Sequence, residues 1–243
     1  MSVKNILIDV GNSSFCKLAV ADGDSILRVS RVAREDLCGA VEACTGPGAQ
    51  ADVICMSSVA DHDPVLEDRL SSGCRKFINV SASTHTGITL EYETPATLGA
   101  DRIAAAAGAA GLFPGEECII FDFGTALTVD YLDSDGRFKG GNISPGLSMR
   151  LSALHHYTGK LPLVSPFFPE RKAGRNTVEA ISNGVVLGIM FEVEKYIADS
   201  PGARVIFTGG DSLFFAKRLK SPIFVVCNLV LEGLFIIARQ NNV

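Results

Sequence analysis

Several classes of protein are excluded by what the sequence lacks. None of its seven cysteines forms a C-x-x-C pair, and no two of its four histidines have the i, i+4 spacing of a helical zinc site. No uncharged apolar run reaches the roughly 18 residues that a membrane-spanning helix needs. The net charge of −5 gives no general attraction to nucleic acid or to anionic membranes. The sequence therefore argues against a zinc–histidine enzyme, a membrane protein and a nucleic-acid-binding protein, and it indicates a small substrate.

The usual nucleotide-binding patterns are also missing. Neither the Walker pattern G-x-x-x-x-G-K-[ST] nor G-x-G-x-x-G occurs, so P-loop and dinucleotide-binding folds lose their main support. The odd number of cysteines, several of them inside apolar runs, is typical of free thiols in a reducing compartment. The first run, Val3–Val10, is predicted to form a strand and lacks the longer apolar segment and cleavage site of a signal peptide. Cytoplasm is therefore the expected location.

What the sequence does contain is an internal repeat. The segment Ile6–Asn12 matches Ile119–Thr125, and at the same spacing Asp22-Gly23 matches Asp135-Gly136. Each copy indicates an apolar strand, an Asp-x-Gly turn, a second strand, and then an Asp-Gly turn of the type that closes hairpins. The two halves of the chain are therefore expected to begin with the same supersecondary structure.

The rest of the chain continues this duplicated pattern. A weaker echo aligns Ala51–Ser58 with Ala203–Gly210, each a β-branched run that ends in small residues. Helices are predicted at residues 62–72, 100–112, 147–157, 176–198, 211–219 and 229–240. The order indicates two similar α/β subdomains, residues 1–114 and 115–243, with a cleft between them and a boundary at Pro114-Gly115.

The two Asp-x-Gly turns are candidates for binding phosphate. Backbone amides in such a turn can contact phosphate oxygens, and the carboxylate can hold or orient a cation. A single Asp-x-Gly is most often a plain hairpin turn, but two copies at matched positions of a duplicated fold favour phosphate binding. The candidates for phosphate and cation contacts are Asp9, Gly11, Asn12, Asp122, Gly124 and Thr125.

Phosphoryl transfer also needs a group that orients the acceptor hydroxyl, and Asp101-Arg102 is the candidate. Taken alone, this pair at the start of a predicted helix is more simply explained by the helix dipole and by mutual pairing. In a chain with two phosphate turns, Asp101 becomes the leading candidate for accepting the hydroxyl proton. Arg102 would then bind an anionic group in a bidentate contact.

Three glycine-rich features leave two interpretations open. The turn Gly140–Leu147 opens a helix whose free amides favour a bound anion, or it is a simple connection. The turn Thr208–Asp211 lets a nucleotide base or ribose approach closely, or it is a plain strand-to-helix turn. Gly184 and Gly188 lie one helical turn apart and indicate close packing, either within the chain or at a subunit interface.

Taken in order, these segments resemble the signature of the type III pantothenate kinases, over nearly the whole chain. The matching segments are Asp9–Asn12, Gly99–Arg102, Asp122–Asp130, Gly140–Gly146 and Asn176-Thr177. The resemblance implies an α/β fold of duplicated actin-like ATPase (ribonuclease H-like) subdomains with a central nucleotide cleft. It implies phosphorylation of the 4′-hydroxyl of pantothenate by ATP, the first step of coenzyme A synthesis. It further implies a homodimer, Mg²⁺ with the nucleotide, and a monovalent cation such as K⁺ or NH₄⁺.

The resemblance also implies roles for individual residues. Asp101 matches the catalytic base, Asp122 the ligand of the monovalent cation, and Thr177 a substrate contact near the dimer interface. The implied nucleotide-binding residues are Asp9, Val10, Gly11, Asn12, Ser13, Ser14, Phe15, Cys16 and Thr125. The implied substrate-binding residues are Tyr92, Gly99, Ala100, Asp101, Arg102 and Thr177.

The first motif departs from the family pattern. The family usually reads Asp-x-Gly-Asn-Thr, often with a lysine seven residues after the aspartate, whereas here Ser13 replaces the threonine and Lys17 lies eight residues on. A shift of one residue along a strand points a side chain to the opposite face, unless a bulge restores the register. Lys17 is therefore left out of the predicted site.

Two other functions compete with this prediction. A kinase of the same superfold acting on a sugar or similar polyol would share both Asp-x-Gly turns, but it does not account for Tyr92, Gly99–Arg102 and Thr177 together. A non-catalytic regulatory relative is the second, although Asp9 and Asp101 are both retained. A polymerising actin-like protein would need large inserted subdomains, for which the chain is too short.

Overall fold

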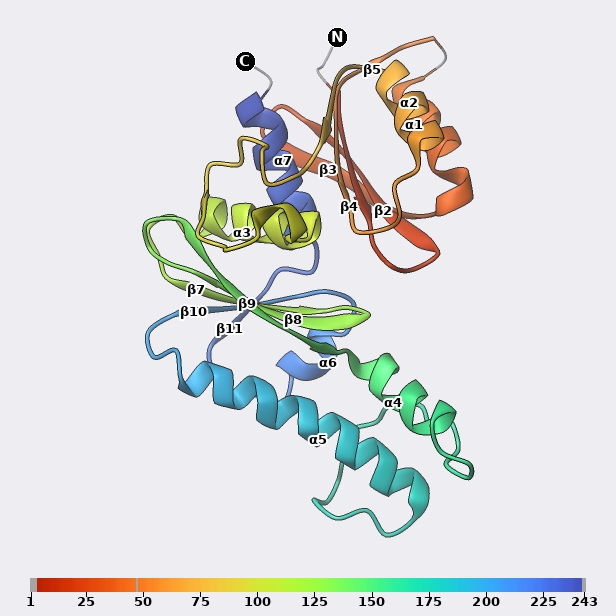
Figure 1. Cartoon of the computed structure of the whole chain (residues 1–243), viewed down its shortest axis with the longest axis vertical. Coiled ribbons are helices and arrows are strands. Elements are labelled where there is room, and N and C mark those ends of the chain that lie inside the picture. The colour runs from red at the N-terminus through yellow and green to blue at the C-terminus, as the bar shows by residue number, and fades with distance from the viewer. Residues whose placement is uncertain (1–3, 47, 242–243) are drawn as a thin grey trace. The chain divides into compact units, whose positions relative to one another are not determined.

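The computed structural model describes residues 4–46 and 48–241, and the chain forms two compact units (Figure 1). The first unit comprises Met1–Gly115, Leu132–Gly140 and Asn228–Val243, and the second comprises Glu116–Tyr131 and Gly141–Cys227. Among the helices in the described ranges, none combines the length and the apolar character needed to span a membrane.

The first unit contains a five-stranded mixed sheet. Its strands are β1 (Lys4–Val10), β2 (Phe15–Asp22), β3 (Ser25–Ala33), β4 (Ala51–Ser58) and β5 (Cys74–Asn79), in the order β3-β2-β1-β4-β5. β4 is parallel to both β1 and β5, whereas β2 is antiparallel to both β1 and β3. The carboxyl ends of β1, β4 and β5 therefore share one edge of the sheet, where ligands bind in open α/β sheets.

Helices cover both faces of this sheet (Figure 1). Side chains alternate along β1, so that Ile6, Ile8 and Val10 join the core formed with α1 (Leu37–Thr45) and α2 (Pro64–Ser72). The intervening residues, including Asp9, face the other side, which is covered by α3 (Ala100–Leu112) and α7 (Leu229–Asn241). Asp9 thus lies at the sheet edge on the face that carries the amino end of α3.

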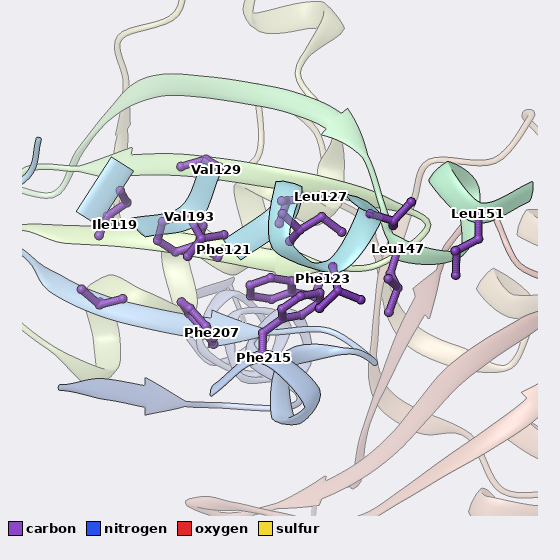
Figure 2. Packing of buried hydrophobic residues seen from close by; sticks show 14 of the residues in the cluster. Ile119, Phe121, Phe123, Leu127, Val129, Leu147, Leu151, Val193, Phe207 and Phe215 are labelled. Atoms are coloured by element: carbon purple, nitrogen blue, oxygen red, sulfur yellow. The ribbon is translucent and has the colours of Figure 1, made fainter. Parts of the chain in front are cut away.

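The second sheet has the order β11-β10-β7-β8-β9-β6. Its strands are β6 (Thr89–Leu90), β7 (Cys118–Phe123), β8 (Ala126–Leu132), β9 (Arg137–Pro145), β10 (Arg204–Thr208) and β11 (Ile223–Val225). The helices of the second unit are α4 (Leu147–His156), α5 (Thr177–Ala198) and α6 (Ser212–Ala216). Its core is centred on aromatic rings: Figure 2 shows Phe123 between Phe207 and Phe215, with ring centroids 4.7 and 5.0 Å away.

The predicted duplication is confirmed by the strand order. β3-β2-β1-β4-β5 in one sheet corresponds to β9-β8-β7-β10-β11 in the other, with β6 added at the edge. Both predicted Asp-Gly turns close hairpins, with φ of +57° at Gly23 and +73° at Gly136. The weaker echo is off by one residue, because Asp9 pairs with Ser57 and Asp122 pairs with Thr208. Ser57 and Thr208 are therefore the equivalent residues of the two halves, as shown by their pairing with the central strands β1 and β7. The sequence alignment alone did not identify them.

The predicted helices are all present, with some differences at their ends. The helix predicted from residue 62 starts at Pro64, because the Asp63 side chain caps it by accepting from the Leu66 N–H at 3.1 Å. The helix predicted over 211–219 is only Ser212–Ala216, and α1 was not predicted. The predicted first strand began at Val3, which lies outside the described residues.

The predicted subdomain limits can be compared with the two units. The units separate after Gly115, one residue from the predicted boundary, but residues 132–140 and α7 belong to the first unit. Two contacts account for this: the start of β9 pairs with β6, and α7 packs against α3. A single boundary in the sequence does not describe these units, because residues 132–140 and α7 lie after it and still belong to the first unit.

The α3–α7 contact depends on glycine. A Cβ at Gly233 would overlap the carbonyl oxygen of Ala104, and a Cβ at Gly108 would lie 2.6 Å from the Leu229 carbonyl oxygen. Neither neighbour is the end of a flexible side chain, so backbone meets backbone at this crossing. The alanine-rich sequence of α3 is explained by this close approach.

Gly233→Ala is expected to destabilise the chain by about 2–4 kcal/mol, because the added methyl group must push two helix backbones apart. The measurement is urea unfolding followed by circular dichroism. Gly39→Ala is the matched control: it is another helical glycine, with nothing within 4 Å of its Cβ position. This control should be neutral or slightly stabilising. Equal unfolding midpoints for the two variants would contradict the backbone-contact explanation.

Candidate active site

Asp9, at the carboxyl end of β1, lies in a row of polar side chains that crosses three strands. It is paired with Ser57 on β4 and with Lys17 on β2. The buried Ser57 hydroxyl donates to Asp9 Oδ1 at 3.0 Å. Burial raises the pKa of Asp9, while Lys17 and the Ser57 hydrogen bond lower it and nearby Asp101 raises it further. The row therefore stabilises a carboxylate that burial alone would drive toward the neutral form.

Lys17 lies on the same face of the sheet as Asp9, since direct cross-strand partners point to the same side. The face change expected from the one-residue shift does not occur. The register between β1 and β2 is continuous from Lys4–Asp22 to Asp9–Lys17. Lys17 is thus a basic side chain beside Asp9 that the sequence interpretation left out.

The turn after Asp9 is built mainly to present its backbone. A Cβ at Gly11 would have nothing within 4 Å, and Asn12, Ser13 and Ser14 are exposed. The Ser13 hydroxyl donates to the Phe15 carbonyl oxygen at 2.7 Å, which holds the turn closed. Of the nine predicted nucleotide-binding residues, Val10 and Cys16 have buried side chains in the core, so only their backbone could reach a ligand.

Asp101 is held at the amino end of α3. Its Oδ1 accepts from the Arg102 N–H at 2.8 Å, and a Cβ at Gly99 would lie 2.5 Å from the same oxygen. Burial raises the pKa of Asp101, and the backbone N–H and the guanidinium of Arg102 lower it. The structure brings Asp101 close enough to Asp9 for its charge to affect the Asp9 pKa. Asp101 and the first Asp-x-Gly turn therefore lie near each other in the first unit.

Arg102 and Tyr92 also lie together. Arg102 is buried, and its Cζ is 6.0 Å from the centroid of the Tyr92 ring and 5.6 Å from that of Phe138. The two rings are 6.1 Å apart, and a Cβ at Gly140 would contact the Tyr92 ring at 3.5 Å. Cation–π contact with these rings orients the guanidinium at the start of α3. The predicted substrate residues Tyr92, Gly99, Ala100, Asp101 and Arg102 are thus gathered in the first unit.

A pocket of about 860 Å³ borders Gly99 and Ala100 at the start of α3. It was not predicted from the sequence. It is lined by small and hydroxyl-bearing residues from Ser58–Ala60, Val80–Ser83 and Pro95–Ala100. The carboxyl ends of β4 and β5 lead directly into it, as expected for a ligand site in an open α/β sheet. Ser57 was missed as well; the only sequence signal for it would have been the correct strand register.

The second unit carries Asp122 and Thr125 at the turn between β7 and β8. A Cβ at Gly209, where φ is +88°, would overlap Asp122 Oδ1, so only glycine fits against this carboxylate. The Asp211 N–H donates to the Phe123 carbonyl oxygen at 3.1 Å, and burial raises the pKa of Asp211. The Thr208–Asp211 turn therefore lies directly against the second phosphate turn.

The Gly140–Leu147 turn supports the second phosphate turn. The Gly146 N–H donates to the Thr125 carbonyl oxygen at 3.0 Å, and a Cβ at Gly146 would overlap the Gly124 carbonyl oxygen. A Cβ at Gly141 would overlap the Val129 carbonyl oxygen in the same way. These glycines are required because two backbone segments touch.

Thr177 lies in a different setting within the second unit. It is the first residue of α5, after Asn176, whose side chain accepts from the Glu179 N–H at 2.9 Å. It lines a largely apolar groove of about 1210 Å³ between α4 and α5, together with Met149, Tyr157 and Gly184. Gly184 has nothing within 4 Å of its Cβ position and is open to this groove.

The donors available to a cation are oxygens. Within the described residues, 4–46 and 48–241, no group of three or more His, Cys, Asp or Glu side chains could hold a metal ion. The Asp122 carboxylate and the Phe123 carbonyl oxygen both lie beside Gly209. Oxygen ligands of this kind suit a hard cation better than a soft transition metal.

Comparison with known proteins agrees with this geometry. The family model described as "Type III pantothenate kinase" matches residues 5–199. A type III pantothenate kinase of Bacteroides fragilis is 37% identical over 242 residues, covering 98% of each chain.

Solved structures place the fold. A Campylobacter jejuni protein assigned to the Baf family of transcriptional activators has a TM-score of 0.65 at 22% identity, covering 97% of this chain and 98% of that one. A ROK family glucokinase of Streptomyces griseus has a TM-score of 0.50 at 14% identity, and the match covers 98% of this chain and 100% of that one. The fold is thus that of the actin-like ATPases and sugar kinases, and the chain belongs to the type III pantothenate kinase family.

Proposed function

We propose that this chain transfers the terminal phosphoryl group of ATP to the 4′-hydroxyl of pantothenate. The observation that carries the proposal is the pair of partly buried carboxylates with raised pKa, Asp101 at the amino end of α3 and Asp9 at the end of β1. Family membership supports the same acceptor and donor.

Asp101 is proposed as the general base. Burial raises its pKa, which makes the carboxylate a better proton acceptor than an exposed aspartate, while the Arg102 N–H still fixes its orientation. Arg102 and Tyr92 would bind the anionic end of pantothenate, with the guanidinium oriented by the aromatic rings. The pocket beside Gly99 gives the acceptor room next to the base.

The nucleotide would contact the exposed backbone of the Gly11–Ser14 turn and, in the second unit, Thr125. We assign Mg²⁺ to the nucleotide phosphates and the monovalent cation to Asp122, where oxygen donors are available. These cations would supply positive charge that offsets the charge of the transferred phosphoryl group. None of the seven cysteines, all within the described residues, forms a disulfide, which supports a reducing, cytoplasmic location.

The direct test is ADP release from ATP and pantothenate with Mg²⁺ and with K⁺, NH₄⁺ or Na⁺ as the only monovalent cation. Turnover should require pantothenate, and K⁺ or NH₄⁺ should stimulate it at least about 10-fold over Na⁺, if a cation site contributes the 1.4 kcal/mol that a factor of ten represents. No turnover by folded protein in any of these salts would reject the proposed reaction. Turnover with a sugar in place of pantothenate would favour the alternative kinase.

Asp101→Asn is expected to lower kcat at least about 100-fold, the usual scale for losing a general base. Asparagine keeps an oxygen that accepts from the Arg102 N–H, so the fold should be retained. Asp68→Asn, at an exposed aspartate of α2, is the matched control and should retain full activity. Activity of the Asp101 variant within a few-fold of wild type would remove Asp101 from its role.

Asp101→Asn is also expected to change how the stability of the protein depends on pH. Since burial raises the pKa of Asp101 above its ordinary 3.8, the ionised carboxylate costs the folded state stability at neutral pH, and this cost disappears as the pH falls below 3.8. The melting temperature of Asp101→Asn should therefore equal or exceed that of wild type at pH 7, and the difference should shrink toward pH 4. A variant that is less stable at pH 7 would contradict this.

We also propose that the chain is a homodimer and that the groove between α4 and α5 is the subunit contact. Its walls expose apolar side chains: Met149 is 43% exposed, Val178, beside the groove residue Thr177, is 44%, and Tyr157 is 83%. A second copy would cover these side chains and would lie beside Thr177, the predicted substrate contact. An apolar patch of this kind is characteristic of an interface.

Met149→Glu should weaken dimerisation at least about 100-fold, because it would bury an unpaired charge in the contact. The measurement is sedimentation equilibrium across a range of protein concentrations. Val65→Glu, at a valine of α2 that is 69% exposed, is the matched control and should leave the dimer intact. A monomeric wild-type chain, or an unaffected Met149 variant, would reject this contact.

A further inference from the structure

A polar network outside the predicted site joins the end of β9 to α4 and α5. Arg150 donates from Nε to the Pro145 carbonyl oxygen at 2.7 Å, and from Nη2 to Ser144 Oγ at 3.1 Å and to Glu192 Oε2. The Ser144 hydroxyl donates to Glu192 Oε1 at 2.7 Å, which closes the ring. The side chains of Arg150 and Glu192 are only 22% and 23% exposed, so solvent screens this pair less than a surface pair.

The position of Arg150 needs an explanation. It lies near the amino end of α4, where its N–H donates to the Gly146 carbonyl oxygen, and a cation there opposes the helix dipole. Glu192 compensates from α5. A Cβ at Gly188, one turn before Glu192, would lie 3.9 Å from Arg150 Nη1, an ordinary van der Waals contact.

The network fixes the residues that precede Gly146. Ser144 and Pro145 are held by Arg150, and the next residue, Gly146, donates to the Thr125 carbonyl oxygen and packs against Gly124 without room for a Cβ. The second phosphate turn thus rests on a segment whose other side is tied to two helices. A small displacement of this segment moves the backbone that would contact the nucleotide.

We infer that Arg150 and Glu192 are positioning residues for the nucleotide, which they affect by clamping Ser144–Gly146 against the Gly124-Thr125 turn. This inference rests on the proposed function. It assigns neither residue a contact with ATP. It also predicts that nucleotide affinity changes while the acceptor contacts of Asp101 and Tyr92, which lie in the first unit, do not.

The test compares Arg150→Met with wild type by calorimetric titration of ATP with Mg²⁺ and by steady-state kinetics. ATP affinity should fall about 10-fold, because the Gly124-Thr125 turn would be misplaced, and the KM for ATP should rise in parallel. A 10-fold loss corresponds to about 1.4 kcal/mol of binding free energy. The KM for pantothenate should stay within about twofold. Arg150→Lys should recover part of the loss, because a cation near Glu192 is restored without the Pro145 and Ser144 contacts.

The matched control is Lys195→Met, which removes a cation from an exposed ion pair with Asp199 on the same helix as Glu192. It should bind ATP as wild type does. If Arg150→Met does not fold, Glu192→Gln gives the same test, because it keeps an acceptor for Ser144 and loses the charge. That variant should weaken ATP binding at least about threefold, the effect of losing one charge-assisted contact in a partly screened site.

Normal ATP affinity in a folded variant, or equal losses for ATP and pantothenate, would overturn the inference. Wild-type protein that binds ATP without phosphorylating pantothenate would reject the proposed function, and the calorimetric comparison would still decide the role of Arg150. Wild-type protein that binds no ATP would reject both.

Discussion

The hydrogen-bond register between the central strand and its parallel neighbour decides which side chains meet in each half of the molecule. In the first sheet it places Asp9 opposite Ser57, and in the second it places Asp122 opposite Thr208. A shift by one residue would turn each of these side chains to the opposite face of its sheet. The apolar residues on the other face, such as Ile8 and Val10, hold the register, because the same shift would remove them from the core that they form with α1 and α2. Core packing on one face thus positions carboxylates on the other.

A second constraint is the close approach of backbone to backbone. Gly233 and Gly108 allow α7 to cross α3, and Gly146 and Gly209 allow two loops to lie against the Asp122–Thr125 turn. In each case a methyl group would meet a backbone carbonyl oxygen, which cannot rotate away. The sites of glycine in this chain therefore follow from packing as much as from turn geometry.

The internal repeat and the helices other than α1 could be predicted from the sequence, since apolar periodicity and the Asp-x-Gly turns are local signals, whereas the link between Asp9 and Asp101 rested on the family resemblance. Ser57 and Lys17 could not, because their pairing with Asp9 depends on how many residues the connections absorb, and a one-residue difference decides the face. The hydrogen-bond network of Ser144, Arg150 and Glu192 could not be predicted from the sequence either. Its members are far apart in the sequence, and each is an ordinary polar residue until the helices pack.

The first-unit site depends on a balance between burial and compensation. Burial pushes Asp9 and Asp101 toward their neutral forms, and each carboxylate also has groups that favour its charge: Ser57 and Lys17 for Asp9, and Arg102 for Asp101. Full compensation would return ordinary aspartates, which are weak bases, whereas burial alone would leave neutral acids. Because compensation is only partial, the pKa of each carboxyl stays above its ordinary value, so each carboxylate has a raised affinity for a proton. Under the proposed function, the stability lost by burying the Asp101 carboxylate is what raises its affinity for the hydroxyl proton of the acceptor.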